Sequence, residues 1–355
     1  CTFGTYSGQV SGDSVTITPT CTFANADVGT GKTVTCTYAI NNTSYTAPSS
    51  QTTTANITAK SIAVSWGTVT WTYDGEAHST TATATTGVSG ETMTVSIANN
   101  SVGPNAGTQA VTASCGSVSG GRAKCTNYTL TSTSKTLTIN AKALTPSTGT
   151  CSNKTYNGTT AATCSSYSVT GVVSGDSVTV TPTCTFANAD VGTSKAITCT
   201  GTISGTQKDN YTVGNATGSA NITAKSIAVS WGTLTWTYDG EAHSTTASAT
   251  TGVSGETMTV SIANNSVGPN VGTQAVTASC GSVSGGRAKC SNYTLTSTSK
   301  TLTINKKAIT GGAPTCSDKT YDGTKNASCT FGTYSGQVSG DSVTITPTCT
   351  FSDAD

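Results

Sequence analysis

The sequence has few charged residues, few histidines and no long apolar run, and each shortage excludes a class of function. Among 355 residues, 17 are Lys or Arg and 16 are Asp or Glu, which gives a formal net charge of +1. A basic surface for nucleic acid is therefore not expected. No stretch reaches the roughly 18 apolar residues of a membrane helix, so no membrane segment is predicted. With two histidines and no activated serine or cysteine constellation, we expect neither an enzyme nor a cofactor.

The residues that are abundant indicate a secreted β protein. Threonine is frequent, and its β-branched side chain suits the solvent face of a strand. The 14 cysteines include no Cys-x-x-Cys pair, which favours disulfides over zinc and a secreted, extracellular or cell-surface location. The chain starts with Cys1 and without an apolar leader, so we interpret it as an interior segment of a longer secreted protein.

Internal repeats dominate the sequence. Residues 59–140 recur at 224–305 with four substitutions, and a second kind of repeat lies between and around these copies. Such self-similarity is typical of tandem arrays. We predict five domains of two kinds, A and B, in the order B1 (1–58, partial), A1 (59–142), B2 (143–223), A2 (224–306) and B3 (307–355, partial).

Alternating apolar residues predict strands and place cysteines opposite each other. In B1, Val34, Cys36 and Tyr38 share one face of a predicted strand, and Cys21 lies on the inward face of its neighbour. We therefore expect Cys21 to pair with Cys36, and the other pairs follow from proximity and repetition, although four cysteines in one B repeat allow three connectivities. The remaining predicted pairs are Cys115–Cys125, Cys151–Cys164, Cys184–Cys199, Cys280–Cys290 and Cys316–Cys329. Cys1 and Cys349 are left unpaired, because the repeat would supply their partners outside the chain.

Short strands separated by turn residues, without helical periodicity, predict an all-β fold. The expected architecture is a tandem array of small antiparallel, immunoglobulin-like β-sandwiches stapled by disulfides, with a β-grasp-like topology as the alternative. In A1 the apolar parity changes at Gly67, which indicates a bulge or a short turn.

Several short motifs recur in a fixed order. They are the aromatic-Asp/Asn-Gly turns at Tyr73, Tyr156 and Tyr321, "SGDSVT", "ADVGT", "NYT" and the closing "NITAK" or "LTIN". Together they resemble the MBG and YDG repeat domains of large bacterial fibrillar surface proteins, with A similar to the MBG type and B to the YDG type. The resemblance implies stalk repeats of adhesins, without catalytic residues.

Two further patterns could bind a ligand. Asp74, Glu76 and His78 alternate in A1, as Asp239, Glu241 and His243 do in A2; on a strand they could offer ligands to a divalent ion. A solvated strand is the simpler interpretation, so no metal site is predicted. The Thr-x-Thr runs could form a glycan- or ice-binding face, but alternating threonine is ordinary on an exposed sheet.

The expected function is therefore mechanical. We predict a stalk or fibre segment of a secreted adhesin whose partners are neighbouring repeats and, in a fibre, other copies. The alternative is that the repeats themselves bind a surface glycan or a host protein, or assemble into an extracellular filament.

Overall fold

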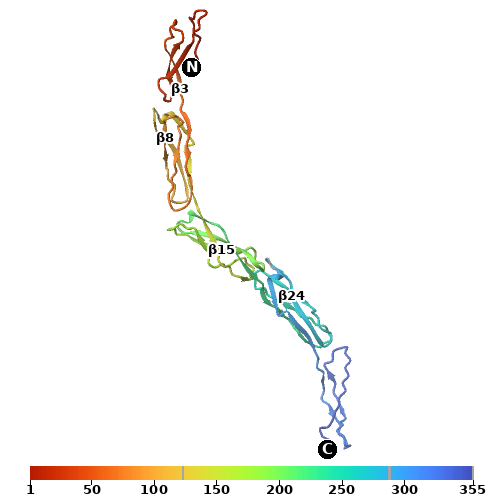
Figure 1. Cartoon of the computed structure of the whole chain (residues 1–355). Helices are drawn as coiled ribbons and strands as arrows, with labels where there is room; N and C mark the ends of the chain where they lie inside the picture. Colours follow the sequence, from red (N-terminus) through yellow and green to blue (C-terminus); the bar gives the residue numbers. More distant parts are fainter. Residues whose placement is uncertain (122–123, 287–288, 354–355) are drawn as a thin grey trace. The chain divides into compact units, whose positions relative to one another are not determined.

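The computed structural model describes residues 1–121, 124–286 and 289–353. These residues form short β-strands and three single-turn 3-10 helices, η1 (Cys125–Asn127), η2 (Lys208–Asn210) and η3 (Cys290–Asn292), and strands dominate throughout (Figure 1). The all-β prediction is confirmed. Among the same residues, no helix has the length and apolarity needed to cross a membrane.

The described chain divides into two compact units. Unit 1 comprises Cys1–Pro146, Val169–Thr181 and Gly201–Gly214, and unit 2 comprises Ser147–Ser168, Pro182–Thr200 and Asn215–Asp355. Repeat B2 thus contributes residues to both units. The division into units therefore passes through B2.

The two A repeats have the same strand order. In A1, β4 (Lys60–Ala63) pairs with β10 (Tyr128–Thr131), and β5 (Ser65–Trp66) pairs with β7 (Ala82–Thr83). A four-stranded sheet follows the order β6-β11-β9-β8, formed by Thr70–Thr72, Ser134–Asn140, Gly107–Ser119 and Thr92–Ala98. The equivalent strands of A2 are β19 (Lys225–Ala228), β20 (Ser230–Trp231), β21 (Thr235–Thr237), β22 (Ala247–Ser248), β23 (Thr257–Ala263), β24 (Gly272–Ser284), β25 (Tyr293–Thr296) and β26 (Ser299–Asn305).

The B repeats contain related sheets. B1 has three strands, β1 (Ile17–Phe23), β2 (Gly29–Ile40) and β3 (Gln51–Ile57), in the order β1-β2-β3. B2 has the sheets β14-β12-β17 and β13-β18-β16-β15. Their strands are β12 (Lys142–Ser147), β13 (Lys154–Thr155), β14 (Ser168–Thr170), β15 (Thr179–Phe186), β16 (Gly192–Ser204), β17 (Tyr211–Val213) and β18 (Ala216–Thr223). B3 has four two-residue strands, β27 (Thr310–Gly311), β28 (Thr315–Cys316), β29 (Cys329–Thr330) and β30 (Tyr334–Ser335).

The pairing is not purely antiparallel, which corrects one part of the sequence prediction. The long hairpins β1–β2 and β8–β9 are antiparallel, but β4 pairs in parallel with β10 and β6 in parallel with β11. Both parallel pairs join the start of a repeat to its end. Periodicity indicates which face of a strand is buried but not the direction of its partner strand. The sequence therefore could not show that the first and last strands of a repeat pair in parallel.

The parity change at Gly67 marks a change of sheet. β5 ends at Trp66 and β6 begins at Thr70 in the four-stranded sheet, while the N–H of Gly67 donates to the Thr81 carbonyl at 2.8 Å. A Cβ at position 67 would lie 2.5 Å from Thr81 Oγ1. A side chain at this position would therefore force the Thr81 side chain to move.

Each unit has its own thin core. In unit 1, Leu137, Ile139 and Val111 are almost fully buried together with Tyr73 and Tyr211. In unit 2, one cluster contains Ile197, Ile222, Cys199, Tyr156 and Tyr293, and a second contains Val276, Leu302 and Ile304. The cluster of Tyr73 and Tyr211 and that of Tyr156 and Tyr293 each combine residues of two successive repeats, so the repeats share apolar cores at their junctions.

Candidate functional site: the junctions between repeats

The aromatic-Asp/Asn-Gly turn of one repeat lies against the Val-Ser-Gly-Asp/Glu turn of the next. In unit 1, Tyr73 follows β6, and its backbone N–H donates to the carbonyl of Asn140 at the end of β11 (2.8 Å). The facing turn is closed by a hydrogen bond from the Asp176 N–H to the Val173 carbonyl at 3.1 Å. This turn holds the Asp176 carboxylate towards the tyrosine, which fixes the geometry of the contact.

Two tyrosine hydroxyls donate to one carboxylate at the A1–B2 junction. The Tyr73 hydroxyl donates to Asp176 Oδ2 at 2.8 Å, and the Tyr211 hydroxyl donates to the same oxygen. The two rings meet edge to face, with centroids 5.3 Å apart, a favourable geometry for aromatic pairs. We call this arrangement the tyrosine clamp.

Unit 2 contains the same clamp at the B2–A2 junction. Tyr156 donates to Glu256 Oε1 at 2.6 Å and Tyr293 donates to Glu256 Oε2 at 2.5 Å. Their ring centroids lie 5.4 Å apart, again edge to face. Glutamate replaces aspartate, but two phenols still share one carboxylate. In the same unit, Tyr238 of A2 donates to Asp341 of B3 at 3.0 Å.

Burial and the shared carboxylates hold the clamp tyrosines in their neutral form. Desolvation, followed by the hydrogen bond to Glu256, raises the pKa of Tyr156 to about 12. Desolvation and the Asp176 hydrogen bond likewise raise the pKa of Tyr211 to about 12. The pKa of Tyr293 is raised for the same reasons, with Glu256 as its partner. Each phenol therefore remains a hydrogen-bond donor well above neutral pH.

The glycine of each turn contacts a valine of the following repeat. Gly158 has φ +77, and a Cβ there would lie 2.8 Å from Val253 Cγ1. Gly75 and Gly240 also have positive φ and would place a Cβ 3.3 Å and 3.2 Å from the equivalent valines, Val173 and Val338. Glycine thus serves two purposes here, because it permits the turn and lets the next repeat approach closely.

A second contact, the asparagine latch, uses the asparagine of each "NYT" motif. In unit 2, Asn292 is fully buried; its Oδ1 accepts the Val191 N–H at 2.9 Å, and its Nδ2 donates to Asp190 Oδ1 at 3.2 Å. In unit 1, Asn210 bonds in the same way to the Ala106 N–H (2.9 Å) and to Asn105 Oδ1 (3.1 Å).

The asparagine latch also joins B1 to A1. The sequence analysis did not predict a contact between these two repeats. Asn127 Oδ1 accepts the Val28 N–H at 2.9 Å, and its Nδ2 donates to Asp27. Lys124 forms an ion pair with Asp27 at 2.7 Å, as Lys289 does with Asp190. These lysines, followed by the asparagines, lower the pKa of both aspartates.

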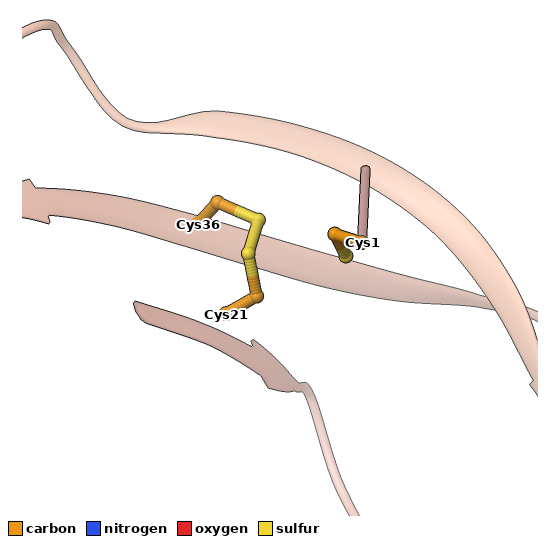
Figure 2. A group of neighbouring side chains, drawn as sticks. All are labelled: Cys1, Cys21 and Cys36. Atoms are coloured by element: carbon orange, nitrogen blue, oxygen red, sulfur yellow. A yellow bond between two sulfur atoms is a disulfide. The ribbon is translucent and has the colours of Figure 1, made fainter. Parts of the chain in front are cut away.

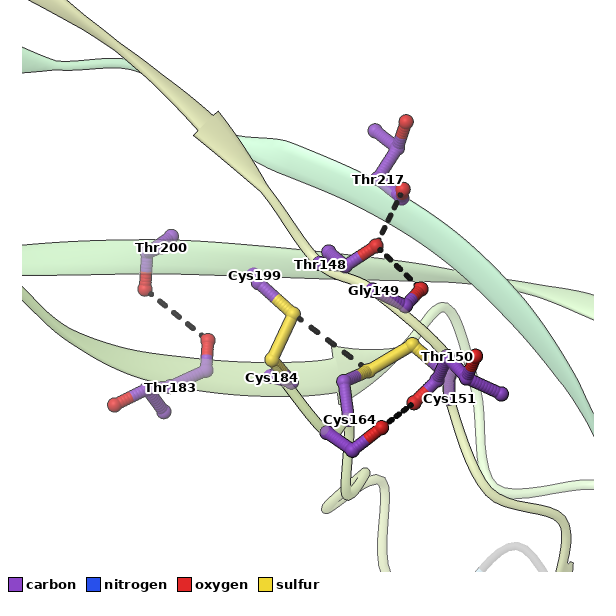
Figure 3. Close-up of a disulfide and its surroundings, with 11 residues drawn as sticks. Thr148, Gly149, Thr150, Cys151, Cys164, Thr183, Cys184, Cys199, Thr200 and Thr217 are labelled. Carbon is purple, nitrogen blue, oxygen red and sulfur yellow. Dashed lines mark hydrogen bonds between the residues drawn. A yellow bond between two sulfur atoms is a disulfide. The ribbon is translucent and has the colours of Figure 1, made fainter. Parts of the chain in front are cut away.

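The described residues form six disulfides, between the same cysteines that the repeats led us to pair. They are Cys21–Cys36, Cys115–Cys125, Cys151–Cys164, Cys184–Cys199, Cys280–Cys290 and Cys316–Cys329. Cys1 and Cys349 are free. Cys1 lies beside the Cys21–Cys36 disulfide (Figure 2), and the two disulfides of B2 lie next to each other (Figure 3).

Asp74, Glu76 and His78 of A1 do not bring three ligand atoms together. Among the described residues, the groups of His, Cys, Asp or Glu whose ligand atoms all lie within 4.8 Å of one another are two cysteine trios. His78 instead stacks on Trp71, with ring centroids 4.9 Å apart, and lies 3.1 Å from Asp74. The backbone N–H of Glu76 donates to Asp74 Oδ1 at 3.0 Å. Asp239, Glu241 and His243 repeat these contacts in A2.

Sequence comparison identifies the B repeats. A family model described as the YDG domain matches residues 1–55, 140–220 and 305–355, together more than half of the chain. The chain belongs to the YDG domain family. No curated protein matches it. The matched YDG segments coincide closely with B1, B2 and B3, and they supply Tyr156, Asp176 and Tyr211 of the clamps.

The sequence singled out the tyrosine turns but not their partners. It gave no role to Asp176, Glu256 or the asparagines of "NYT". The signal that could have found them is the recurrence of Val-Ser-Gly-Asp or Val-Ser-Gly-Glu in both repeat types, since a shared motif in otherwise dissimilar repeats indicates a shared contact.

Proposed function

We propose that this YDG-family chain is a mechanical segment of an extracellular stalk or fibre, such as that of a bacterial surface adhesin. The observation that carries the proposal is the recurrence of one set of contacts at successive junctions. The latch occurs at Asn127, Asn210 and Asn292, and the clamp at Asp176 and Glu256. Side chains that are wholly or partly buried and hydrogen-bonded across a junction restrict its bending, as a load-bearing segment requires.

The disulfides support the same function. They close loops with sequence separations of 10 to 15 residues, and closing a loop of 15 residues stabilises a fold by about 3 kcal/mol in the chain-entropy model. In small domains with thin cores this is a large contribution. Six disulfides also favour an oxidising environment, and we propose that the segment lies outside the cell.

The finer assignments belong to the same proposal. We propose that each repeat folds as a small sandwich of two packed sheets, immunoglobulin-like in its layers, and that 59–142 and 224–306 are MBG-type repeats alternating with the YDG segments. The recurrence of the sheet β6-β11-β9-β8 as β21-β26-β24-β23 supports a common fold for the two A repeats.

A binding function of the repeats is the second candidate, and the tryptophans weigh against it. An exposed aromatic cluster is typical of glycan-binding surfaces. Trp66 and Trp71 are partly buried and pack on the core of unit 1, and the Trp66 indole N–H donates to the Ser132 carbonyl at 2.8 Å. They therefore serve the fold.

Small-angle X-ray scattering tests the mechanical proposal. We expect wild-type chain to fit a narrow distribution of maximum dimensions, and a variant with both clamps removed, Asp176→Ala with Glu256→Ala, to fit a broader one. Circular dichroism of both proteins controls for loss of fold. Equally broad distributions for the two proteins would contradict the proposal, and retention of the chain on a glycan array would favour the binding alternative.

A further inference from the structure

Four sulfur atoms lie together in repeat B2. Cys199 Sγ is 3.9 Å from Cys164 Sγ, which belongs to the other disulfide, and Figure 3 marks this contact with a dashed line. The sulfurs of Cys164, Cys184 and Cys199 all lie within 4.8 Å of one another. Cys199 is fully buried, whereas the other three cysteines are partly exposed. The Cys151–Cys164 disulfide is thus reachable from solvent. It contacts the Cys184–Cys199 disulfide, in which the Cys199 sulfur is buried.

The surrounding backbone holds the sulfurs in this contact. A Cβ at Gly218 would lie 2.7 Å from Cys151 Sγ, so glycine makes room for the outer disulfide. The buried Thr148 donates from its hydroxyl to the Thr217 carbonyl at 3.1 Å (Figure 3). The Ser165 N–H donates to the Thr150 carbonyl at 2.8 Å. These bonds fix the segments on either side of Cys151 and Cys164.

We propose that the four cysteines of B2 form a thiol–disulfide exchange site whose substrate is a thiol. A thiolate from solution attacks Cys151 Sγ, forms a mixed disulfide with it and releases the Cys164 thiolate. This thiolate attacks Cys199 Sγ, 3.9 Å away; the Cys164–Cys199 bond forms, the Cys184–Cys199 bond breaks, and Cys184 leaves as a thiolate that takes a proton from water. One disulfide replaces another at each step, so no net oxidant or reductant is needed.

Repeat B1 carries the same arrangement, and the cysteine equivalent to Cys164 is a free thiol in this chain because the position equivalent to its partner Cys151 falls before Cys1. Cys1 occupies the position of Cys164, and its sulfur lies within 4.8 Å of both sulfurs of the Cys21–Cys36 disulfide (Figure 2). Cys349 is also free but belongs to neither cysteine trio among the described residues. The 355-residue chain therefore contains one thiol placed for exchange and a second thiol that is not.

The first test uses the wild-type chain incubated near pH 8, then quenched with an alkylating reagent and mapped by mass spectrometry. We expect a Cys1–Cys36 linkage to accumulate together with alkylated Cys21, whereas Cys349 is alkylated and Cys316–Cys329 stays intact. Complete alkylation of Cys1 with an unchanged Cys21–Cys36 disulfide would overturn the exchange geometry.

The second test addresses B2 itself and is independent of the stalk proposal. Cys151→Ser leaves Cys164 as a free thiol, and we expect alkylation of Cys184 to increase at least about tenfold over the control Cys164→Ser, with a Cys164–Cys199 linkage appearing. Treating the wild-type chain with glutathione should give the same new linkage without any substitution. If both experiments yield Cys184–Cys199 alone, the proposal is wrong.

Discussion

Repeats A1 and A2 are nearly identical in sequence but differ in what their neighbours cover. In A2, Tyr293 is 7% exposed and Asn292 is fully buried, and Tyr156 of B2 shares the Glu256 carboxylate. In A1, the equivalent Tyr128 is partly exposed and bonds to Glu91 without a second phenol, because the position of B1 equivalent to Tyr156 falls before Cys1. The clamp is therefore a property of two repeats, not of one.

The comparison also separates two causes of the same pKa shift. The pKa of Tyr128 is raised first by its hydrogen bond to Glu91 and then by desolvation. For Tyr293 the order is reversed, and desolvation comes first. Because the immediate sequences match, the neighbouring repeat accounts for the additional burial.

The largest effect is expected from removing the shared carboxylate. Glu256→Ala leaves the buried hydroxyls of Tyr156 and Tyr293 without their acceptor, which should lower the free energy of unfolding of unit 2 by about 3 kcal/mol or more. Glu91→Ala removes one bond from a partly exposed tyrosine and should cost less than half as much. Hydrogen exchange resolved by mass spectrometry measures the stability of each A repeat separately. Equal losses of stability in A1 and A2 would show that Tyr156 contributes nothing.

A smaller effect is expected at the turn glycines. Gly158→Ala places a methyl group 2.8 Å from Val253 Cγ1 at φ +77, whereas Gly323 has φ +75 and nothing within 4 Å. The backbone cost, about 1 kcal/mol, should be common to both substitutions, so any additional destabilisation by Gly158→Ala reports the contact between repeats. Denaturant unfolding of the two variants gives this difference directly, and identical midpoints would exclude a role for the valine contact.

The sequence indicated local structure well and contacts between repeats poorly. The faces of β2 and the pairing of Cys21 with Cys36 follow from period-two alternation, because both depend on neighbouring strands of one hairpin. The clamp joins Tyr156 to a carboxylate 100 residues away, and no local pattern specifies such a partner. The disagreement over parallel strands has the same origin, since β6 and β11 lie at opposite ends of a repeat.

Alkaline pH should weaken the clamps. The pKa of Tyr156 and Tyr211 is raised from 10.0 to about 12 in the folded chain, so between these values the unfolded chain releases protons that the folded chain retains. The stabilisation is therefore fully present below about pH 10 and is lost as pH rises towards 12. Between pH 9 and 12, the thermal unfolding temperature should fall more steeply for the wild-type chain than for the variant with Tyr156→Phe and Tyr211→Phe. Parallel curves for the two proteins would contradict this prediction.

The smallest effect is expected from the lysines beside the latches. Lys289 pairs with Asp190 at 2.7 Å and is the first cause of the lowered pKa of Asp190. The stabilisation that this ion pair contributes is present above the ordinary pKa of aspartate. It is lost as pH falls through the pKa of Asp190 in the folded chain. Lys289→Ala should therefore raise the pKa of Asp190 while Asn292 keeps part of the shift. Titration of the side-chain carboxyl carbons by NMR measures this, with Asp27 and Lys124→Ala as the matched pair in unit 1. Because Lys289 is mostly exposed, the effect should shrink in high salt, whereas the shift that remains from Asn292, which is fully buried, should persist.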